Sequence, residues 1–480
     1  MHNLDLLNSS VISLISRPPV ICKADTKVHE VVSMMVKNKI GSVVVVDEQE
    51  IPLGIVTDKD LRNKVLAHNL GTEIPVESIM SKPVVTISTE TIAFEALRIM
   101  MKNDIHHLPV VNETRRIKGV ISSHDLMLLS TPHPIAFIRE IGEQNSLEGL
   151  SFLFKQTSQV AASLLRSGLS MYHLCLLITE IHDHIIRKIL ELTTSSLIQE
   201  KSIKEDLSEH LCWLVFGSEG RREQTLITDQ DNGIVFSNIP IEIANSFGDK
   251  AINYLLQCGY PICSGGIMAN QPNWCRSISS WEKALKKWII NQNENTVIWL
   301  TVIADLRPIW GNFSLAKDLY HIFVKTIKSW RGIFRNLAQT ALINAPSNFL
   351  EWFAAQRASG GRNLLNIKLY GISAIVNGIR LYALMEDIED KNTWQRLNKL
   401  KEKGVISEQD AQDLLGAFDF LMRIRLQHQL KCVGREKIPD NIIDLRELSS
   451  LEYGFLKGAL KAINRFQAVL REKFYLSPII

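Results

Sequence analysis

Two patterns of hydrophobic and polar positions divide the chain into a mixed N-terminal part and a mostly helical remainder. Between residues 17 and 130, short apolar runs of strand length alternate with amphipathic stretches of helical period. Beyond residue 131, long amphipathic patterns dominate, interrupted by strand-like apolar runs at 211–216 and 233–236. The pattern predicts an α/β N-terminal part, a second α/β segment in the middle and helices elsewhere.

The N-terminal part contains an internal repeat with a spacing of 65 residues. The string GIVTDKDL at 54–61 matches GVISSHDL at 119–126. Each copy reads strand, amphipathic helix, two short strands and helix, with the first helices expected at 28–38 and 93–103. A duplicated unit of this size indicates two domains of the same fold.

Each repeat carries a polar pair that suits a nucleotide. Thr57 and Ser122 follow an apolar strand and open a helix, where a hydroxyl and N–H groups fit a phosphate. Asp60 and Asp125 lie one turn further on and could accept hydrogen bonds from a ribose diol. The same pairs also fit capping boxes that only stabilise the helix starts, and the sequence leaves both interpretations open.

The repeat resembles a tandem pair of CBS domains, also called a Bateman module, over both copies in full. This resemblance implies that an adenine nucleotide binds in the cleft between the copies, at Thr57, Asp60, Ser122 and Asp125. Such modules often pair, so the resemblance also implies a homodimer.

A second stretch, LCWLVFGSEGRREQTLITDQDNGIVF at 211–236, carries residues suited to phosphate and metal chemistry. Gly217 and Ser218 end an apolar run before one or two expected helical turns, where N–H groups and a hydroxyl can meet phosphate oxygens. Asp229 and Asp231 are two residues apart, which on a strand places both carboxylates on one face, about 6.6 Å apart along the chain. The pair could therefore converge on Mg²⁺ ions, as in two-metal phosphoryl transfer.

The Gly217-Ser218 pair, followed after ten residues by Asp229-x-Asp231, resembles the nucleotidyltransferase signature of the DNA polymerase β superfamily. The longer string GSEGRREQTLITDQDN resembles a narrower group, the bacterial nucleotidyltransferases fused to CBS domains. That group is related to PII uridylyltransferase and glutamine-synthetase adenylyltransferase. The resemblance implies a third metal-binding carboxylate on a neighbouring strand, for which Asp305 in the strand-like run TVIADLRP is the candidate. The alternative for Asp305 is a simple surface pair with Arg307.

Several basic residues are candidates for phosphate contacts. Arg221 and Arg222 could bind the triphosphate or the pyrophosphate leaving group, although each fits a solvated helix position equally well. The C-terminal region resembles the helical domain that accompanies this nucleotidyltransferase group. Four basic residues of this region could face the active site and contact phosphates: Lys368, Arg380, Arg423 and Arg425. The alternative is that they lie on a solvated or interdomain face.

Two further features lie outside the repeat and the 211–236 stretch. The small-residue segment 259–270 contains Gly265-Gly266 and either borders the nucleotide pocket or forms a hairpin turn. His182-Asp183 invites comparison with HD hydrolases, but the other spaced His and Asp ligands are missing. We therefore expect this pair on a helix surface.

Net charge, the longest apolar runs and the cysteines indicate which partners and which compartment to expect. A net charge of +3 is too small to indicate binding to nucleic acid or to an anionic membrane. The N-terminus lacks the pattern of a signal peptide, and no run of 18 apolar residues exists. Seven scattered cysteines fit reduced thiols. We therefore expect a cytoplasmic protein with no nucleic-acid or membrane partner.

These patterns predict a multidomain α/β and α architecture: a tandem CBS module, a polymerase-β-like α/β nucleotidyltransferase core and a C-terminal helical bundle. The expected boundaries are CBS domains at 17–76 and 82–131, a helical connector at 132–205, the core at 206–312 and the helical domain at 313–480.

The predicted function is Mg²⁺-dependent transfer of a nucleotidyl group, uridylyl or adenylyl, from a nucleoside triphosphate to an acceptor protein. In this hypothesis, adenine nucleotides on the CBS pair regulate the transfer. The alternative is a signal-transduction protein without catalysis, which senses adenine nucleotides and relays CBS occupancy to a partner.

Overall fold

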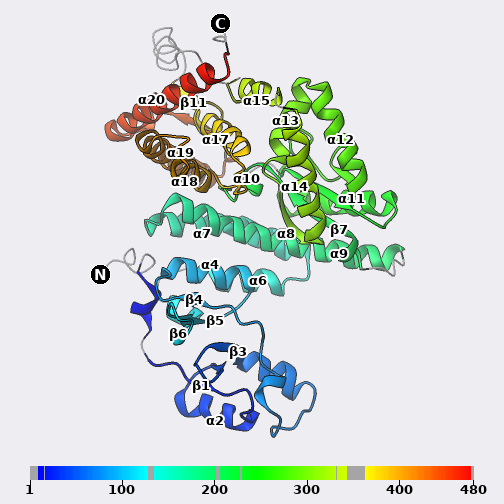
Figure 1. The fold of residues 1–480 in the computed structure, drawn as a ribbon, viewed down its shortest axis with the longest axis vertical. Coiled ribbons are helices and arrows are strands. Elements are labelled where there is room, and N and C mark those ends of the chain that lie inside the picture. Colours follow the sequence, from blue (N-terminus) through cyan, green and yellow to red (C-terminus); the bar gives the residue numbers. More distant parts are fainter. Residues whose placement is uncertain are drawn as a thin grey trace. The chain divides into compact units, whose positions relative to one another are not determined.

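The computed structural model describes residues 9–15, 17–127, 134–201, 206–226, 230–330, 332–342 and 363–476. The chain divides into two compact units (Figure 1). The first comprises Met1–Glu140 with Ser163–Leu169, and the second comprises Ile141–Ala162 with Ser170–Ile480.

The first unit contains two three-stranded sheets with the same strand order and register. In each sheet the first strand runs parallel to the second, and the second pairs antiparallel with the third. Ser42 lies opposite Thr57 in one sheet and His107 lies opposite Ser122 in the other, which is the 65-residue shift seen in the sequence. The strands are β1 (Ile21–Cys22), β2 (Ser42–Val46), β3 (Pro52–Thr57), β4 (Ile87–Ser88), β5 (His107–Val111) and β6 (Ile117–Ser122).

The helices of the first unit confirm the predicted repeat, because α2 and α4 have the bounds expected from the sequence. The helical elements are η1 (Val11–Leu14), α2 (Val28–Asn38), α3 (Asp58–Asp60), η2 (Leu61–Leu66), η3 (Val76–Ser78), α4 (Ala93–Asn103), α5 (Ser123–Met127) and α6 (Pro134–Glu143), whose last residues belong to the second unit.

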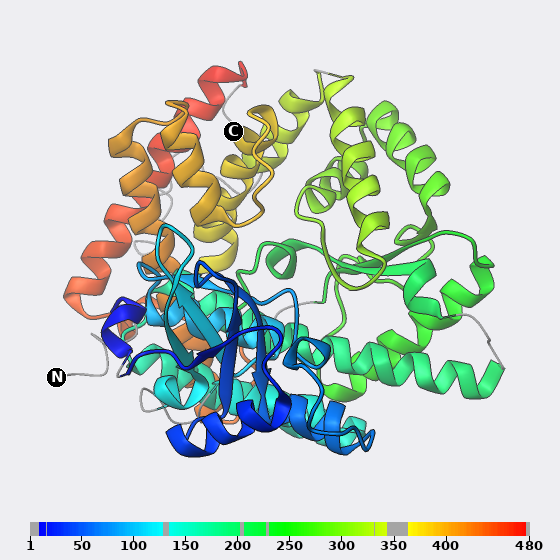
Figure 2. The same cartoon turned by 60° about the horizontal axis from the view of Figure 1, so that its bottom comes forward.

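Strand β2 shows why the first unit contains continuous apolar runs. Its residues are buried at every position. Val43 and Val45 belong to a core cluster with residues of α2, whereas Val44 packs in a separate cluster with Ile117 of the second repeat. The two sheets therefore face each other, as Figure 2 shows in blue and cyan, and β2 is covered on both sides.

The second unit is built around one four-stranded sheet in the order β10-β7-β8-β9. The strands are β7 (Leu211–Val215), β8 (Asn232–Phe236), β9 (Cys275–Ser277) and β10 (Arg307–Gly311). The central strand β7 is antiparallel to β8 and β10, and β8 runs parallel to β9. All residues of β7 and β8 are buried, in agreement with the two predicted apolar runs.

Helices surround this sheet and form the bundle at the C-terminal end (Figure 1). They are α7 (Leu147–Arg166), which crosses the boundary between the units, α8 (Met171–Lys201), α9 (Leu207–His210), α10 (Gly217–Gly220), α11 (Ile241–Cys258), α12 (Ile278–Asn291), α13 (Glu294–Ile303), α14 (Phe313–Lys328), α15 (Ile333–Leu342), η4 (Lys368–Ile372), α17 (Ser373–Met385), α18 (Thr393–Glu402), α19 (Glu408–Gly434), η5 (Leu445–Glu447) and α20 (Ser450–Lys473). A short antiparallel pair, β11 (Leu364–Asn366) and β12 (Ile442–Asp444), lies among the last of them.

The strand expected around Asp305 is wrong. The apolar run before Asp305 is the helix α13, and the strand β10 begins only at Arg307. Asn293 caps the helix, since its side chain accepts a hydrogen bond from the Thr296 N–H group. The buried positions Thr296, Val297, Leu300 and Ile303 follow helical spacing, which the β-branched composition of the run concealed.

The turn between α13 and β10 carries a buried carboxylate that joins the sheet to the C-terminal helices. Asp305 is fully buried. Its Oδ2 accepts hydrogen bonds from Arg221 Nη1 at 2.7 Å and from Arg380 Nη2 at 2.6 Å. Its Oδ1 accepts one from Arg396 Nη1 at 2.8 Å. Burial alone would raise the pKa of Asp305, but the three guanidiniums hold that pKa well below its ordinary value.

A second buried pair attaches α8 to the edge of the sheet. Arg307 donates to both oxygens of Asp183 at 2.6 and 2.9 Å, and it also donates to the backbone carbonyl of Glu219. Two fully desolvated carboxylates, Asp183 and Asp305, thus hold helices from opposite ends of the second unit against one sheet.

We predict that Asp305→Ala lowers the free energy of unfolding of the second unit by about 3–5 kcal/mol, because it leaves three buried guanidiniums without their shared acceptor. The urea midpoint measured by tryptophan fluorescence checks this. The matched control is Asp318→Ala, an exposed aspartate on α14. An unchanged midpoint in Asp305→Ala would contradict the structural role.

The same carboxylate predicts a pH dependence of stability. Because folding lowers the pKa of Asp305, its contribution to the free energy of unfolding is present above pH ~4 and is lost at lower pH.

Candidate active site

A pocket of about 180 Å³ lies in the second unit, between the sheet and the C-terminal helices. One wall is formed by the turn after β7 and the residue before β8, and the other by η4, α17 and α19. The lining residues are Gly217, Ser218, Arg221, Glu223, Asp231, Lys368, Ile372, Ser373, Val376, Asn377, Arg380, Met422 and Arg425.

The turn after β7 brings Gly217, Ser218 and Asp231 together, as the sequence predicts. Gly217 has a φ of +54°, and a Cβ on this residue would lie 2.5 Å from Asp231 Oδ2. Only glycine therefore allows the carboxylate to approach the turn so closely. The Phe216 N–H group donates to the backbone carbonyl of Asp231 at 2.9 Å, which fixes the two segments side by side. Asp229 lies outside the described residues.

Two residues next to Asp231 were not identified from the sequence. The Cys263 thiol donates to Asp231 Oδ1 at 3.0 Å, and burial together with the charge of Asp231 raises the pKa of Cys263 to about 12. Glu219 is buried, and burial together with the charges of Asp183 and Asp231 raises its pKa well above the ordinary value. Cys263 belongs to the segment 259–270, so this segment does contact the site.

Asp305 does not complete a metal site with Asp231, which corrects the prediction from the resemblance. Both of its oxygens accept hydrogen bonds from guanidiniums, and it is absent from the residues that line the pocket. The alternative of a surface pair with Arg307 is also wrong, because Asp305 is fully buried and Arg307 pairs with Asp183.

The two candidate arginines of the motif have different roles. Arg221 lines the pocket, but its side chain is held by Glu223 at 2.7 Å and by Asp305. Arg222 turns away from the pocket and donates to Glu180 of α8 at 2.5 Å. The prediction that Arg222 binds phosphate is therefore contradicted, because its charge is committed to a buried carboxylate.

The C-terminal helices supply the other basic side chains of the pocket. Lys368, Arg380 and Arg425 line it, so three of the four predicted residues face this pocket, and their role in an active site stays a prediction. Arg423 is not among the lining residues, and its nearest acidic partner is Asp419 at 3.9 Å. Ser373 and Asn377 were missed, although polar residues at helical spacing with Arg380 in the otherwise apolar α17 are a usable signal.

The His182-Asp183 pair is buried, so the expected helix-surface position is wrong. His182 Nδ1 lies 2.9 Å from the Tyr260 hydroxyl, and burial lowers the pKa of His182 to about 4. Asp183 is the acceptor for Arg307. The pair therefore serves packing and charge balance.

In the first unit, the polar pairs form capping boxes in both repeats. Asp60 Oδ2 accepts from the N–H and the hydroxyl of Thr57 at 2.9 and 2.7 Å, and Asp125 Oδ2 accepts from Ser122 at 2.8 and 2.7 Å. The repeats differ at the other oxygen. Asp60 Oδ1 contacts Lys64 and Ser81, each at 2.8 Å, whereas Asp125 Oδ1 has no hydrogen-bond donor among the described residues.

Family comparisons match most of the chain. The description "CBS domain" matches residues 11–67 and 76–130. "Putative nucleotidyltransferase DUF294" matches 155–295, and "Putative nucleotidyltransferase substrate binding domain" matches 331–474. The pocket is lined by residues of both nucleotidyltransferase matches.

Similar curated proteins overlap about a quarter of this chain. An uncharacterized protein of Methanopyrus kandleri is 31% identical over 136 residues, which are 28% of this chain and 69% of that protein. An uncharacterized protein of Methanocaldococcus jannaschii is 34% identical over 131 residues, 27% of this chain and 69% of that protein. Inosine-5'-monophosphate dehydrogenase of Aquifex aeolicus is 37% identical over 110 residues, 23% of this chain and 22% of the enzyme.

Similar solved structures cover a quarter of the chain as well. An uncharacterized conserved protein from Pyrococcus horikoshii is 27% identical with a TM-score of 0.24, and 92% of it is covered. A CBS domain protein from Pyrobaculum aerophilum, solved in complex with AMP, is 26% identical with a TM-score of 0.24, and 90% of it is covered.

Within the described residues, every helix is too short or too polar to cross a membrane. The fold confirms the predicted combination of a duplicated α/β unit, an α/β core and a helical C-terminal domain. With a CBS pair, a nucleotidyltransferase domain and the substrate binding domain that accompanies it, this protein belongs to the CBS-domain-linked nucleotidyltransferase family.

Proposed function

We propose that the second unit transfers a nucleotidyl group from a Mg²⁺-bound nucleoside triphosphate to an acceptor protein. The observation that carries this proposal is the pocket itself. It joins Gly217, Ser218 and Asp231 to three basic side chains from the C-terminal helices. A carboxylate facing a cluster of cations is the arrangement that a metal-bound polyphosphate requires.

The described residues fit a magnesium site. Asp231 lines the pocket, and its Oδ2 lies so close to the turn at Gly217 that a side chain there would collide with it. Mg²⁺ is usually held by one or two carboxylates together with phosphate oxygens and water, so Asp231 could hold it without Asp305, and Asp229 stays a second candidate from the sequence alone. A bound Mg²⁺ would neutralise phosphate charge and polarise the phosphoryl group.

The remaining roles belong to the protein's own side chains. The Ser218 hydroxyl and the first N–H groups of α10 would hold phosphate oxygens. Lys368 and Arg425 would bind the same anion from the opposite wall. Glu223 keeps Arg221 in place, because its Oε2 accepts from Arg221 while its Oε1 accepts from the backbone N–H of Thr393.

The acceptor protein is proposed by analogy with the uridylyl- and adenylyltransferases that the motif resembles. The homodimer expected from the CBS resemblance remains a prediction. For the first unit, we propose that an adenine nucleotide binds at Ser122 and Asp125 and regulates transfer. The support is that, within the part of the chain that the structure describes, no donor contacts Asp125 Oδ1, which lies beside a helix start where it could bind a ribose diol.

One observation favours a second function, nucleotide sensing without catalysis. The third carboxylate implied by the resemblance is engaged with three arginines, and a thiol contacts Asp231 instead. In that case, the pocket would bind a nucleotide and the chain would relay CBS occupancy to a partner without turnover.

The transfer proposal predicts that α-labelled nucleotide, Mg²⁺ and a cell extract give a labelled protein with the wild-type chain. Asp231→Asn should lower the rate by at least about 100-fold, because it removes a ligand charge from the metal-bound triphosphate. Asp318→Asn, on the exposed face of α14, should retain the wild-type rate. Gel autoradiography with each of the four labelled triphosphates provides the measurement.

Label transfer that persists in Asp231→Asn would contradict the catalytic assignment. Tight binding of a triphosphate by the wild-type chain, with no labelled product from any nucleotide, would favour the sensing function instead.

The regulatory proposal predicts different effects at the two capping boxes. Asp125→Ala should weaken adenine-nucleotide binding by about 10-fold or more, since a lost ribose contact leaves buried polar groups unpaired. Asp60→Ala should weaken it less, because Lys64 and Ser81 already use the second oxygen of Asp60. Calorimetry with ATP, ADP and AMP measures both variants.

Thermal unfolding of the same two variants is the control. Both lose a capping box, and Asp60→Ala also loses the contacts of Asp60 with Lys64 and Ser81, so it should lose at least as much stability as Asp125→Ala. Unchanged affinity in both variants would mean that the boxes serve only as helix caps.

A further inference from the structure

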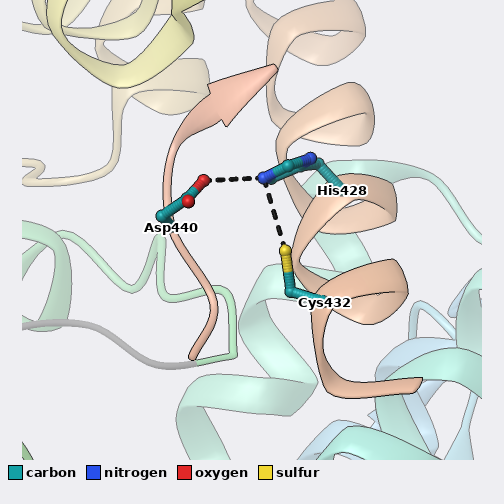
Figure 3. A group of neighbouring side chains, drawn as sticks. All are labelled: His428, Cys432 and Asp440. Atoms are coloured by element: carbon teal, nitrogen blue, oxygen red, sulfur yellow. Dashed lines mark hydrogen bonds and ion pairs between the residues drawn. The ribbon is translucent and has the colours of Figure 1, made fainter. Parts of the chain in front are cut away.

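Three potential metal ligands converge on the helix α19, away from the residues that line the proposed active site. His428 and Cys432 are four residues apart and therefore lie on the same helix face. Asp440, in the segment that leads into β12, points toward them (Figure 3). His428 Nε2 is 2.7 Å from Asp440 Oδ1 and 3.5 Å from Cys432 Sγ, and all three ligand atoms lie within 4.8 Å of one another.

We propose that His428, Cys432 and Asp440 bind a Zn²⁺ ion through imidazole nitrogen, thiolate and carboxylate. Zinc prefers these ligands in tetrahedral geometry with bonds of about 2.0–2.3 Å. Those bonds place nitrogen and sulfur ligands about 3.5 Å apart, which is the separation of His428 Nε2 and Cys432 Sγ. The nitrogen and oxygen ligands need to separate by about half an ångström from their hydrogen-bonded distance.

The surroundings of the cluster fit such a site. The Asp440 side chain is 55% exposed, so water can reach the fourth position of the ion. Its Oδ1 also accepts from the Ile442 N–H group at 2.8 Å, an outer contact that orients the carboxylate. Binding releases the Cys432 thiol proton to solvent, and His428 binds through a deprotonated Nε2.

An ordinary ion pair between His428 and Asp440 would account for two of the three groups. The Cys432 thiol lies within hydrogen-bond distance of the same nitrogen, so the alternative to a metal site is a hydrogen-bonded network of all three groups, and the cobalt titration below distinguishes the two. Because thiolate is a soft ligand, the full set selects zinc or a similar transition metal over Mg²⁺.

The site has a consequence for the pocket, and this part rests on the proposed function. Asn441 follows Asp440, and its Oδ1 accepts from Arg425 Nε at 2.7 Å, while its backbone carbonyl accepts from the Ile367 N–H group. Arg425 lines the pocket. An ion that fixes Asp440 to α19 would therefore hold the segment that positions Arg425.

The test is a Co²⁺ titration of the full-length, metal-free protein, followed by competition with Zn²⁺. We expect one equivalent of cobalt, with visible bands of a tetrahedral ion and a near-ultraviolet thiolate-to-cobalt band that Zn²⁺ abolishes. Cys432→Ser should lose the thiolate band, and Asp440→Asn should bind at least about 10-fold more weakly. Cys22→Ser, which removes a buried thiol of the first unit, is the matched control and should behave as wild type.

A wild-type protein without a thiolate-to-cobalt band, or a band that survives in Cys432→Ser, would overturn the proposal. Zn²⁺ should also raise the unfolding temperature of the wild type but not of Cys432→Ser. These readouts need no nucleotide transfer, so failure of the zinc site and failure of the proposed function are distinguishable. Mg²⁺ gives no thiolate band, which separates this site from Asp231.

Discussion

The second unit depends on the shared burial of one carboxylate and three guanidiniums. Arg221 comes from the motif after β7, Arg380 from α17 and Arg396 from α18, and all three donate to Asp305. None of these charges could be buried alone, so the sheet and the C-terminal helices need one another. With Glu223 as the second acid, three cations face two anions, and the cluster keeps a net charge of +1 (3 − 2) beside the pocket.

This charge balance limits which side chains can hold metal ions in the proposed transfer reaction. A two-metal site needs carboxylates to hold both ions, and Asp305 is not available for that purpose. Lys368 and Arg425 reach the pocket from the helical wall. In the proposed function, basic side chains therefore neutralise part of the phosphate charge that a second metal would otherwise balance. The neutral Cys263 thiol beside Asp231 adds no further negative charge.

The accuracy of the sequence predictions follows the distance over which the residues interact. Gly217 and Asp231 are joined by adjacent strands of one short segment, so the motif predicted their contact. A lone aspartate that is buried in an apolar run needs a partner, and Asp305 has three. Its partners, however, lie 75 to 91 residues away in sequence, where no local pattern connects them. The predicted role of Asp305 as a metal ligand came from the resemblance, and it was wrong because Asp305 binds arginines instead.

The CBS pair was easier to predict because the same pattern of strands and helices occurs in both copies of the repeat. The bounds of α2 and α4 follow directly from helical periodicity and turn residues. The asymmetry between the copies was also present in the sequence, since Lys64 in the first repeat corresponds to Leu129 in the second. The sequence alone does not reveal the consequence of this difference, because the ion pair between Lys64 and Asp60 is seen only in the structure.

Helix α19 connects features that are separate in the sequence. Arg425 reaches the pocket, and Gln429, one turn further on, accepts a hydrogen bond from the Leu226 N–H group through its Oε1 at 3.3 Å. His428 and Cys432 lie on a neighbouring face of the same helix, toward Asp440. Because a helix moves as a rigid element, fixing one of these faces constrains the other. The proposed zinc ion would thus restrict the position of Arg425 without contacting the nucleotide.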